Sequence, residues 1–134
     1  MPVRYLLDTN IASYAIKGNF PQVRKQLLEV PMSEVGISAV TEAELRFGAA
    51  RKAASPHLTL AVEEFLLRVE ILPWDSEAAK HYTTLRTTLE DSGAPMGNLD
   101  MMIAAHALAA EAMLVTHDRV FHRVKQLRIE DWAK

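Results

Sequence analysis

The sequence predicts an α/β fold with a mostly parallel central sheet that has helices on both faces. Short apolar segments typical of buried strands alternate with longer helical segments, and no repeat, low-complexity tract or linker interrupts that order. Strands that are separated by helices are joined by right-handed crossovers, which place helices over both faces of the sheet. The length of 134 residues matches the roughly 100–150 residues of a typical domain. Residues 1–134 are therefore expected to form a single domain.

The first half of the chain is expected to contain two strands and four helices. An apolar run that ends at Asp8 forms the first strand, and Gly18 closes the helix that follows it. Pro21 and Pro56 each suit the first turn of a helix, where a backbone N–H has no partner within the helix. The expected strands cover 3–8 and 34–38, and the expected helices cover 9–18, 20–30, 39–54 and 56–69.

The second half is expected to contain three strands and three helices. Asp75 caps a long helix that ends near Asp91, before Gly93. The next helix is almost wholly apolar, which predicts that it is buried. The expected strands cover 69–74, 112–117 and 127–132, and the expected helices cover 75–91, 99–112 and 118–124.

Composition and charge exclude several classes of protein. The chain has no cysteine, which excludes disulfides, thiolate metal sites and cysteine nucleophiles. Its formal net charge of −2 lacks the basic excess of many nucleic-acid binders. No apolar run approaches the roughly 20 residues of a membrane helix, and no signal peptide is recognised, so we expect a cytoplasmic protein. Glycine-rich nucleotide motifs and the Gly-x-Ser-x-Gly motif of hydrolases are also absent.

Four acidic residues lie just beyond the ends of expected strands. Asp8 ends the first strand, Asp118 follows a later one, and Asp100 opens the apolar helix. Glu44 lies on the helix after the second strand. Ligands of parallel sheets bind beyond the carboxyl ends of the strands, so these acids are expected to meet at one edge. Each also has a structural explanation: Asp8 and Asp118 can act as caps, and Asp100 favours a helix N-terminus. Glu44 can complete a capping box with Thr41.

This expected group of acids indicates a metal site. Carboxylates that lie together repel one another and raise each other's pKa, and a divalent cation relieves that repulsion. Ligands that are all oxygen favour Mg²⁺ or Mn²⁺ over zinc, and no histidine pattern competes with the acids. An acidic metal site without a covalent nucleophile is typical of phosphodiester hydrolysis, because the metal orients a water molecule and stabilises charge on the phosphoryl oxygens.

Two other functions remain open on these observations. The first is a non-catalytic α/β interaction module, in which the acids are caps and apolar helices bind a partner. The second is a phosphoacceptor or phosphatase of another doubly wound fold, which also carries an aspartate after its first strand. That second class normally needs a further acid two residues on, or a lysine after a late strand. The segments DTN at 8–10 and THDR at 116–119 offer neither.

Five segments of the chain resemble the PIN-domain ribonuclease toxins of the VapC family. They are LLDTN at 6–10, SAVTEAELRFGA at 38–49, PMGNLDMMIAAHALA at 95–109, LVTHDRVF at 114–121 and LRIEDW at 127–132. The segments occur in the order of the family and span nearly the whole chain. The resemblance implies a PIN-like domain and an endoribonuclease that depends on Mg²⁺ or Mn²⁺. It also implies that structured RNA such as tRNA is cut and that translation is thereby inhibited.

The resemblance also implies roles for individual residues. The metal ligands of the family correspond to Asp8, Asp100 and Asp118. The catalytic glutamate corresponds to Glu44 and not to Glu42. The implied catalytic set is therefore Asp8, Glu44, Asp100 and Asp118, and the implied supporting residues are Thr9, Asn10 and Thr116.

The partners that the resemblance implies are a small VapB-like antitoxin that occludes the site and a second copy of the chain in a homodimer. Operator DNA is implied only as a partner of the toxin–antitoxin complex. The chain departs from the family at His117, where asparagine is common. Glu42 is an additional acid that is expected to face solvent.

Two basic segments are expected to flank the acidic edge and to contact phosphates of RNA. Arg46, Arg51 and Lys52 lie in the first segment, and Arg119 and Arg123 lie in the second. Contacts of this kind position a nucleic acid without reading its bases. The alternative is that both segments are solvated helix faces.

Helices 9–18 and 39–54 carry more apolar and aromatic side chains than one buried stripe needs. These side chains are Ile11, Tyr14, Ala15, Leu45 and Phe47. One interpretation is a groove that takes an amphipathic segment of the antitoxin, whose arginine pairs with the carboxylates. The other is that these side chains pack in the core or at the homodimer contact.

Overall fold

The structure is a computed structural model, and it describes residues 2–51 and 53–134. Its strands are β1 (Tyr5–Leu7), β2 (Val35–Ser38), β3 (Glu70–Leu72), β4 (Met113–Val115) and β5 (Ile129–Glu130). They form a 5-stranded sheet in the order β3-β2-β1-β4-β5. Every pairing is parallel, and Leu6 of β1 lies opposite Gly36 of β2 and Leu114 of β4. The predicted parallel sheet is therefore confirmed, although each strand is shorter than expected.

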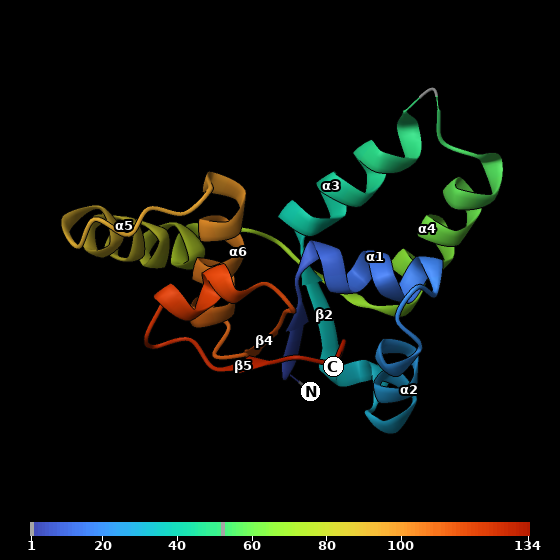
Figure 1. Ribbon diagram of the computed structural model, residues 1–134, viewed down its shortest axis with the longest axis horizontal. Coiled ribbons are helices and arrows are strands. Elements are labelled where there is room, and N and C mark those ends of the chain that lie inside the picture. Colours follow the sequence, from blue (N-terminus) through green and yellow to red (C-terminus); the bar gives the residue numbers. More distant parts are fainter. Residues whose placement is uncertain (1, 52) are drawn as a thin grey trace.

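Helices cover both faces of the sheet, as predicted (Figure 1). One core contains residues of α1 (Thr9–Lys17), α2 (Pro21–Glu29), α3 (Ala39–Ala50) and α4 (Pro56–Arg68). The other core contains residues of α5 (Ser76–Asp91) and α6 (Asn98–Ala109). Successive side chains of a strand point to opposite faces. Leu7 accordingly belongs to the first core and Leu6 to the second, and both are fully buried.

The ends of the helices follow local backbone chemistry. Gly18 ends α1 in the left-handed conformation, with φ of 76°, and its N–H donates to the carbonyl of Tyr14 at 2.7 Å. Glycine adopts this conformation without a steric penalty, so the predicted end is confirmed. The expectation of a helix over 39–54 is wrong at its C-terminal end. α3 ends at Ala50, because Arg51 is extended.

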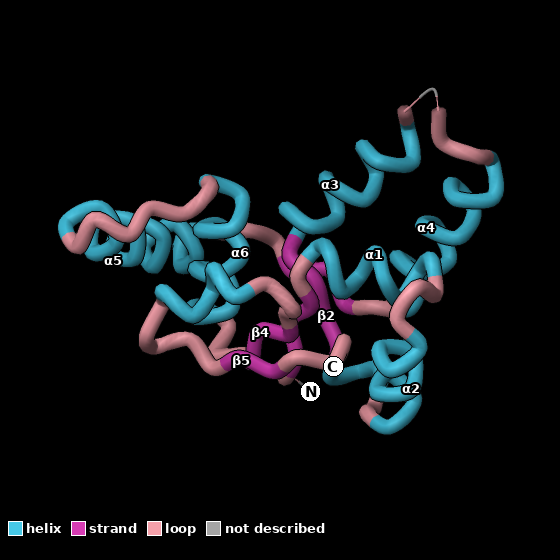
Figure 2. Tube along the Cα trace, in the orientation of Figure 1, coloured by secondary structure: helices cyan, strands magenta, loops and turns pink. Residues whose placement is uncertain are grey.

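The expectation of a helix over 99–112 is also wrong at its C-terminal end, because α6 ends at Ala109 and Glu111 has a positive φ of 53°. Two short 3-10 turns are further differences from the predicted elements. η1 (Met32–Glu34) was not expected, and η2 (Arg119–Arg123) replaces the helix expected over 118–124. α3 and α4 form a pair that extends away from the sheet (Figure 2). Among residues 2–51 and 53–134, no helix combines the length and the apolar character that crossing a bilayer requires.

Candidate active site

Asp8 is a buried carboxylate at the junction between β1 and α1. Its side chain is 3% exposed, and its Oδ1 accepts a hydrogen bond from the Ile11 N–H at 2.8 Å, so Asp8 caps α1. The pKa of Asp8 is raised to about 6, chiefly by burial. Hydrogen bonds from Thr116 and Ile11 oppose this rise, and the carboxylates of Asp100 and Asp118 make smaller contributions to it. Asp8 therefore caps α1 and also has a raised pKa. An aspartate that only caps a helix and lies in solvent would not have such a shift.

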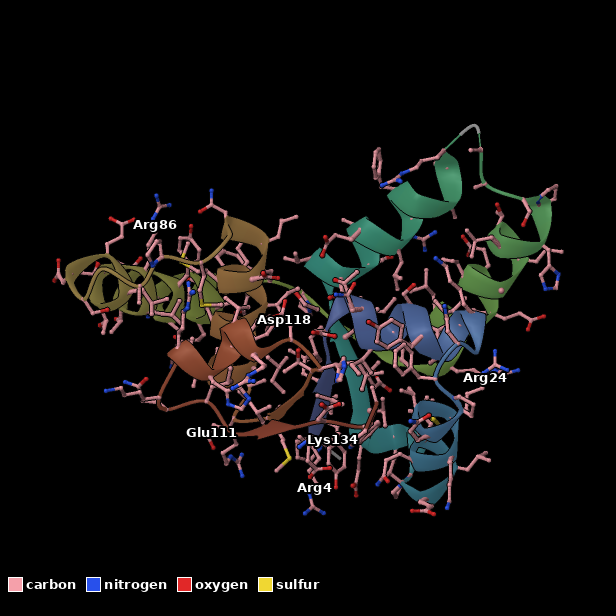
Figure 3. All side chains as sticks on the ribbon, in the orientation of Figure 1. Arg4, Arg24, Arg86, Glu111, Asp118 and Lys134 are labelled. Carbon is pink, nitrogen blue, oxygen red and sulfur yellow. The ribbon has the colours of Figure 1, made fainter. Side chains whose placement is uncertain are left out.

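Asp100 and Asp118 lie at the same edge of the sheet as Asp8. Asp100 is half-buried in the first turn of α6, and burial, Asp118 and Glu44 together raise the pKa of its carboxyl. Asp118 is exposed after β4, and its Oδ1 accepts from the Val120 N–H at 2.9 Å. Figure 3 shows Asp118 between the side of the molecule that holds α5 and α6 and the side that holds α1–α4. These acids are close enough for Asp100 and Asp118 to raise the pKa of Asp8, and their role as metal ligands stays a prediction.

Glu44 is fixed by a chain of hydroxyl groups from α1 and α3. Thr9 Oγ1 donates to Glu44 Oε1 at 2.6 Å, and Thr9 Oγ1 and Thr41 Oγ1 are 3.1 Å apart. A threonine hydroxyl has one proton, so Thr41 must donate to Thr9. The capping-box explanation of Glu44 is wrong. Ser38 caps α3 by accepting from the Val40 N–H at 3.1 Å, and Thr41 is fully buried inside the helix.

The two other supporting residues lie beside the acids. The Thr116 side chain hydrogen-bonds the Asp8 carboxyl, and Thr116 Oγ1 also accepts from the Asp118 N–H at 3.0 Å. Thr116 therefore links two of the acids through one hydroxyl. Asn10 is exposed and lines a groove of about 350 Å³ between α1, α3 and α4, which Glu44 and Gly48 also line. The groove is continuous with the acidic edge through Glu44.

The acids fit a hard divalent cation with water molecules in part of its coordination sphere. Within the described ranges of the chain, no three histidine or acidic side chains converge closely enough to enclose a metal ion. Mg²⁺ is usually bound by only one or two carboxylates and keeps several waters, so it does not need such an enclosure. Burial is the main cause of the raised pKa values of Asp8 and Asp100, and neighbouring carboxylates add to both; a bound cation would favour the ionised form of each.

The basic residues expected to flank the site differ in their surroundings. Arg46 forms ion pairs with Glu42 at 2.9 Å and with Glu63 of α4 at 2.7 Å. The expectation that Glu42 only faces solvent is therefore wrong, because the side chain is 26% exposed and is held by Arg46.

The remaining basic residues of the two segments differ in their contacts and exposure. Arg51 lies over the Phe47 ring at 5.0 Å, and Arg123 donates to the Pro95 carbonyl. Arg119 is exposed beside Asp118. Lys52 lies outside the described residues.

The predicted apolar groove is wrong in most of its lining. Ile11 and Ala15 are buried in the core, and Tyr14 packs on Phe20 with ring centroids 4.2 Å apart. Phe47 is 63% exposed but is not part of the groove wall. Leu45 does line the groove, although it also belongs to the core. The observed groove instead has a polar end at the acidic edge.

Thr41 and Asp131 are neighbours of the site that the sequence did not reveal. Thr41 orders Glu44 through Thr9, and Asp131 holds His117 with a contact of 2.8 Å between Oδ2 and Nδ1. Both contacts join residues that are more than ten positions apart, and no local pattern marks them.

Comparisons with known proteins agree with this geometry. A family model described as PIN domain matches residues 5–127. The chain is 37% identical to a protein of Salmonella typhimurium named tRNA(fMet)-specific endonuclease VapC, over 98% of this chain and 99% of that relative. It is 36% identical to Ribonuclease VapC2 of Rickettsia felis, over 97% and 98%.

A solved structure is similar to this chain over nearly its whole length. The DNA-bound VapBC complex of Salmonella typhimurium contains a chain that matches with a TM-score of 0.90 and 36% identity, over 97% of this chain and 98% of that chain. Nucleases with a PIN domain generally depend on a divalent metal ion. The acids at the carboxyl edge of the sheet, the family match and the full-length relatives together show that this chain belongs to the VapC ribonucleases of the PIN-domain family.

Proposed function

We propose that this chain is the toxin of a toxin–antitoxin pair, a Mg²⁺-dependent endoribonuclease that cuts tRNA in the cytoplasm and so stops translation. Mn²⁺ is the alternative ion. The single observation that carries the proposal is the placement of Asp8, Asp100 and Asp118 at one edge of the sheet, close enough for Asp100 and Asp118 each to raise the pKa of Asp8. Residues 1–134 act as one nuclease domain in this proposal.

The four acids have two different roles in the proposed site. Asp8, Asp100 and Asp118 hold the metal ion, and their oxygen atoms suit a hard cation. When it is bound, the ion supplies Lewis-acid stabilisation of charge that develops on the phosphoryl oxygens. Glu44 is held at one oxygen by Thr9, which leaves its other oxygen to orient a water molecule or accept its proton.

The supporting residues keep these acids in place. Thr116 orients Asp8 and the backbone at Asp118, Thr9 orients Glu44, and Asn10 extends the polar end of the groove toward substrate. Arg119 is exposed beside Asp118 and contacts an RNA phosphate. Arg46 is held by two glutamates, so its contribution to RNA binding is smaller.

The proposed protein partner is a VapB-like antitoxin that binds the groove beside Glu44. The solved relatives support this proposal, because they are VapBC complexes from Rickettsia felis and Salmonella typhimurium bound to DNA. Operator DNA is thus a ligand of the toxin–antitoxin complex and not of this chain alone. The proposed oligomer of the toxin is a homodimer.

The test is cleavage of purified tRNA by the purified chain, with the cut ends mapped by sequencing. Cleavage is expected with Mg²⁺ or Mn²⁺ and is expected to stop with EDTA. Asp100→Asn should abolish cleavage, whereas Asp91→Asn, a change of an exposed acid at the end of α5, should leave it unchanged. Intact tRNA under all conditions, with no change of melting temperature on adding metal, would instead favour a non-catalytic interaction module.

A further inference from the structure

His117 is an exposed aromatic side chain directly beside the acidic edge. His117 lies between Thr116, which hydrogen-bonds Asp8, and Asp118. The His117 side chain is 46% exposed. Such exposure is ordinary for a histidine in a loop, but a hydrogen bond and an aromatic contact also restrain this ring.

The first restraint on the ring is a hydrogen bond. His117 Nδ1 is 2.8 Å from Asp131 Oδ2, and Asp131 Oδ1 accepts from the Ala133 N–H at 2.9 Å. Gln22 of α2 in turn donates to the Ala133 carbonyl at 3.1 Å. The carboxylate that holds the ring is therefore itself anchored. Because a carboxylate accepts at Nδ1, the proton lies on Nδ1, and Nε2 is the nitrogen that remains for other contacts.

The second restraint is aromatic packing. The centroid of the Phe20 ring lies 5.9 Å from that of His117, and the Tyr14 ring lies 4.2 Å from Phe20. These three rings come from α1, from the residue that precedes α2, and from the loop after β4. They form an aromatic row, Tyr14–Phe20–His117, whose His117 end lies next to Asp118. Ring pairs at such distances are within the range of favourable aromatic contacts.

We propose that His117 is a base-stacking residue, whose exposed ring receives an unpaired nucleobase of the RNA next to the phosphate that is cut. The inference rests on the proposed ribonuclease function and adds to it a contact with the base. Proteins that bind unpaired RNA stack its bases on aromatic side chains, and every base has a face that can stack. A ring that is already ordered loses little further conformational entropy when a base binds, so the two restraints favour this use.

The test compares three variants in steady-state cleavage of tRNA. His117→Ala removes the ring, His117→Phe keeps an aromatic face but cannot bond Asp131, and His122→Ala changes an exposed histidine on η2. His117→Ala is expected to raise KM about tenfold, since stacking of one base accounts for a factor of about five to over a hundred. His117→Phe is expected to recover most of the loss, and His122→Ala to match the parent. A phenylalanine variant as weak as the alanine variant would show a polar or charged role for His117 and overturn the inference.

A second measurement uses a short oligoribonucleotide that spans the mapped cut, with abasic nucleotides introduced one at a time. One abasic position should raise KM for the parent as much as His117→Ala does, and should have no further effect in that variant. Equal sensitivity of parent and variant at every position would overturn the stacking contact. Cleavage by the parent separates failure of the stacking inference from failure of the proposed function. If the parent cuts RNA and His117→Ala is unchanged, the stacking inference alone fails. If the parent cuts no RNA, the proposed function and this inference fail together.

Discussion

At the scale of single residues, Asp8 shows that the site is built at a cost in stability. The pKa of Asp8 rises from 3.8 to about 6 on folding, chiefly because of burial. The folded state therefore binds more protons than the unfolded state between those values, so stability falls as pH rises through this window. The ionised carboxylate then lowers the free energy of unfolding by about 3 kcal/mol above pH 6, at 1.36 kcal/mol per pKa unit.

Asp8→Asn is accordingly expected to stabilise the metal-free protein. Asparagine keeps an oxygen that can accept from the Ile11 N–H but carries no charge. In EDTA the melting temperature should rise clearly at pH 7.5 and about half as much at pH 5, because the penalty for ionised Asp8 builds up between pH 3.8 and about 6. The same variant should lose much of the stabilisation that Mg²⁺ gives to the parent.

The matched control for Asp8 is another aspartate that caps a helix. Asp75 caps α5 through the Ala78 N–H at 3.1 Å and is exposed. Asp75→Asn should change the melting temperature little at either pH, because asparagine caps as well as aspartate. If Asp8→Asn behaves like Asp75→Asn, the carboxylate of Asp8 is not strained, and its assignment to the metal site loses its main support.

Glu44→Gln separates catalysis from structure. Glutamine keeps an oxygen that can accept from Thr9, so the melting temperature should stay near that of the parent. Cleavage of tRNA should fall at least about 100-fold, the lower range for loss of a general base. Glu42→Gln is the control on the same helix, since it affects only the ion pair with Arg46. Cleavage by Glu44→Gln within a few-fold of the parent would return Glu44 to a structural role.

At the scale of secondary-structure elements, a buried hydrogen bond joins the helix of Glu44 to the helix of Asp100. Ser38 Oγ accepts from the Val40 N–H at the start of α3 and lies 2.7 Å from His106 Nδ1 of α6. Both side chains are buried, and burial lowers the pKa of His106, which favours the neutral ring. One hydroxyl group thus serves as a helix cap and as the partner of a buried imidazole.

Ser38→Ala is expected to destabilise the protein by about 2–4 kcal/mol, because it removes a cap and leaves a buried ring nitrogen without a partner. Ser55→Ala is the matched control: Ser55 caps α4 through the Leu58 N–H at 3.1 Å but is exposed. Its loss should cost about 1 kcal/mol. Urea unfolding of both variants measures the difference. Equal losses would mean that the bond to His106 adds nothing to stability.

At the scale of the whole molecule, the sequence predicts the features that follow from the order of strands and helices. It does not predict which face each helix turns to its neighbours. The order of strands and helices implies a parallel sheet, and a parallel sheet brings Asp8 and Asp118 to one edge. The face that each helix turns to its neighbours follows from long-range packing. The sequence therefore leaves open whether Ile11 lines a groove or packs in the core, and the structure places it in the core. The contact between Thr9 and Glu44, 35 residues apart, has no local signal in the sequence.

The groove between α1, α3 and α4 offers a test of where the proposed antitoxin binds. Gly48 lines the groove. Apart from its two chain neighbours and the backbone of its own helix, no heavy atom of the described chain lies within 4 Å of a Cβ added to it. Glycine inside a helix is less stable than alanine or leucine by up to about 1 kcal/mol. Gly48→Ala and Gly48→Leu should therefore both raise the free energy of unfolding, although only leucine extends far into the groove.

The two variants should differ in binding the co-encoded antitoxin, as measured by calorimetric titration. Leucine at this position occupies space that a docked segment would use, and overpacking of that kind costs about 1–3 kcal/mol. Gly48→Leu is therefore expected to weaken the complex about tenfold or more, and Gly48→Ala to bind nearly as the parent does. Because both variants gain helix stability, a loss of affinity in Gly48→Leu cannot be attributed to unfolding. Parent-like affinity in Gly48→Leu would place the antitoxin on another surface.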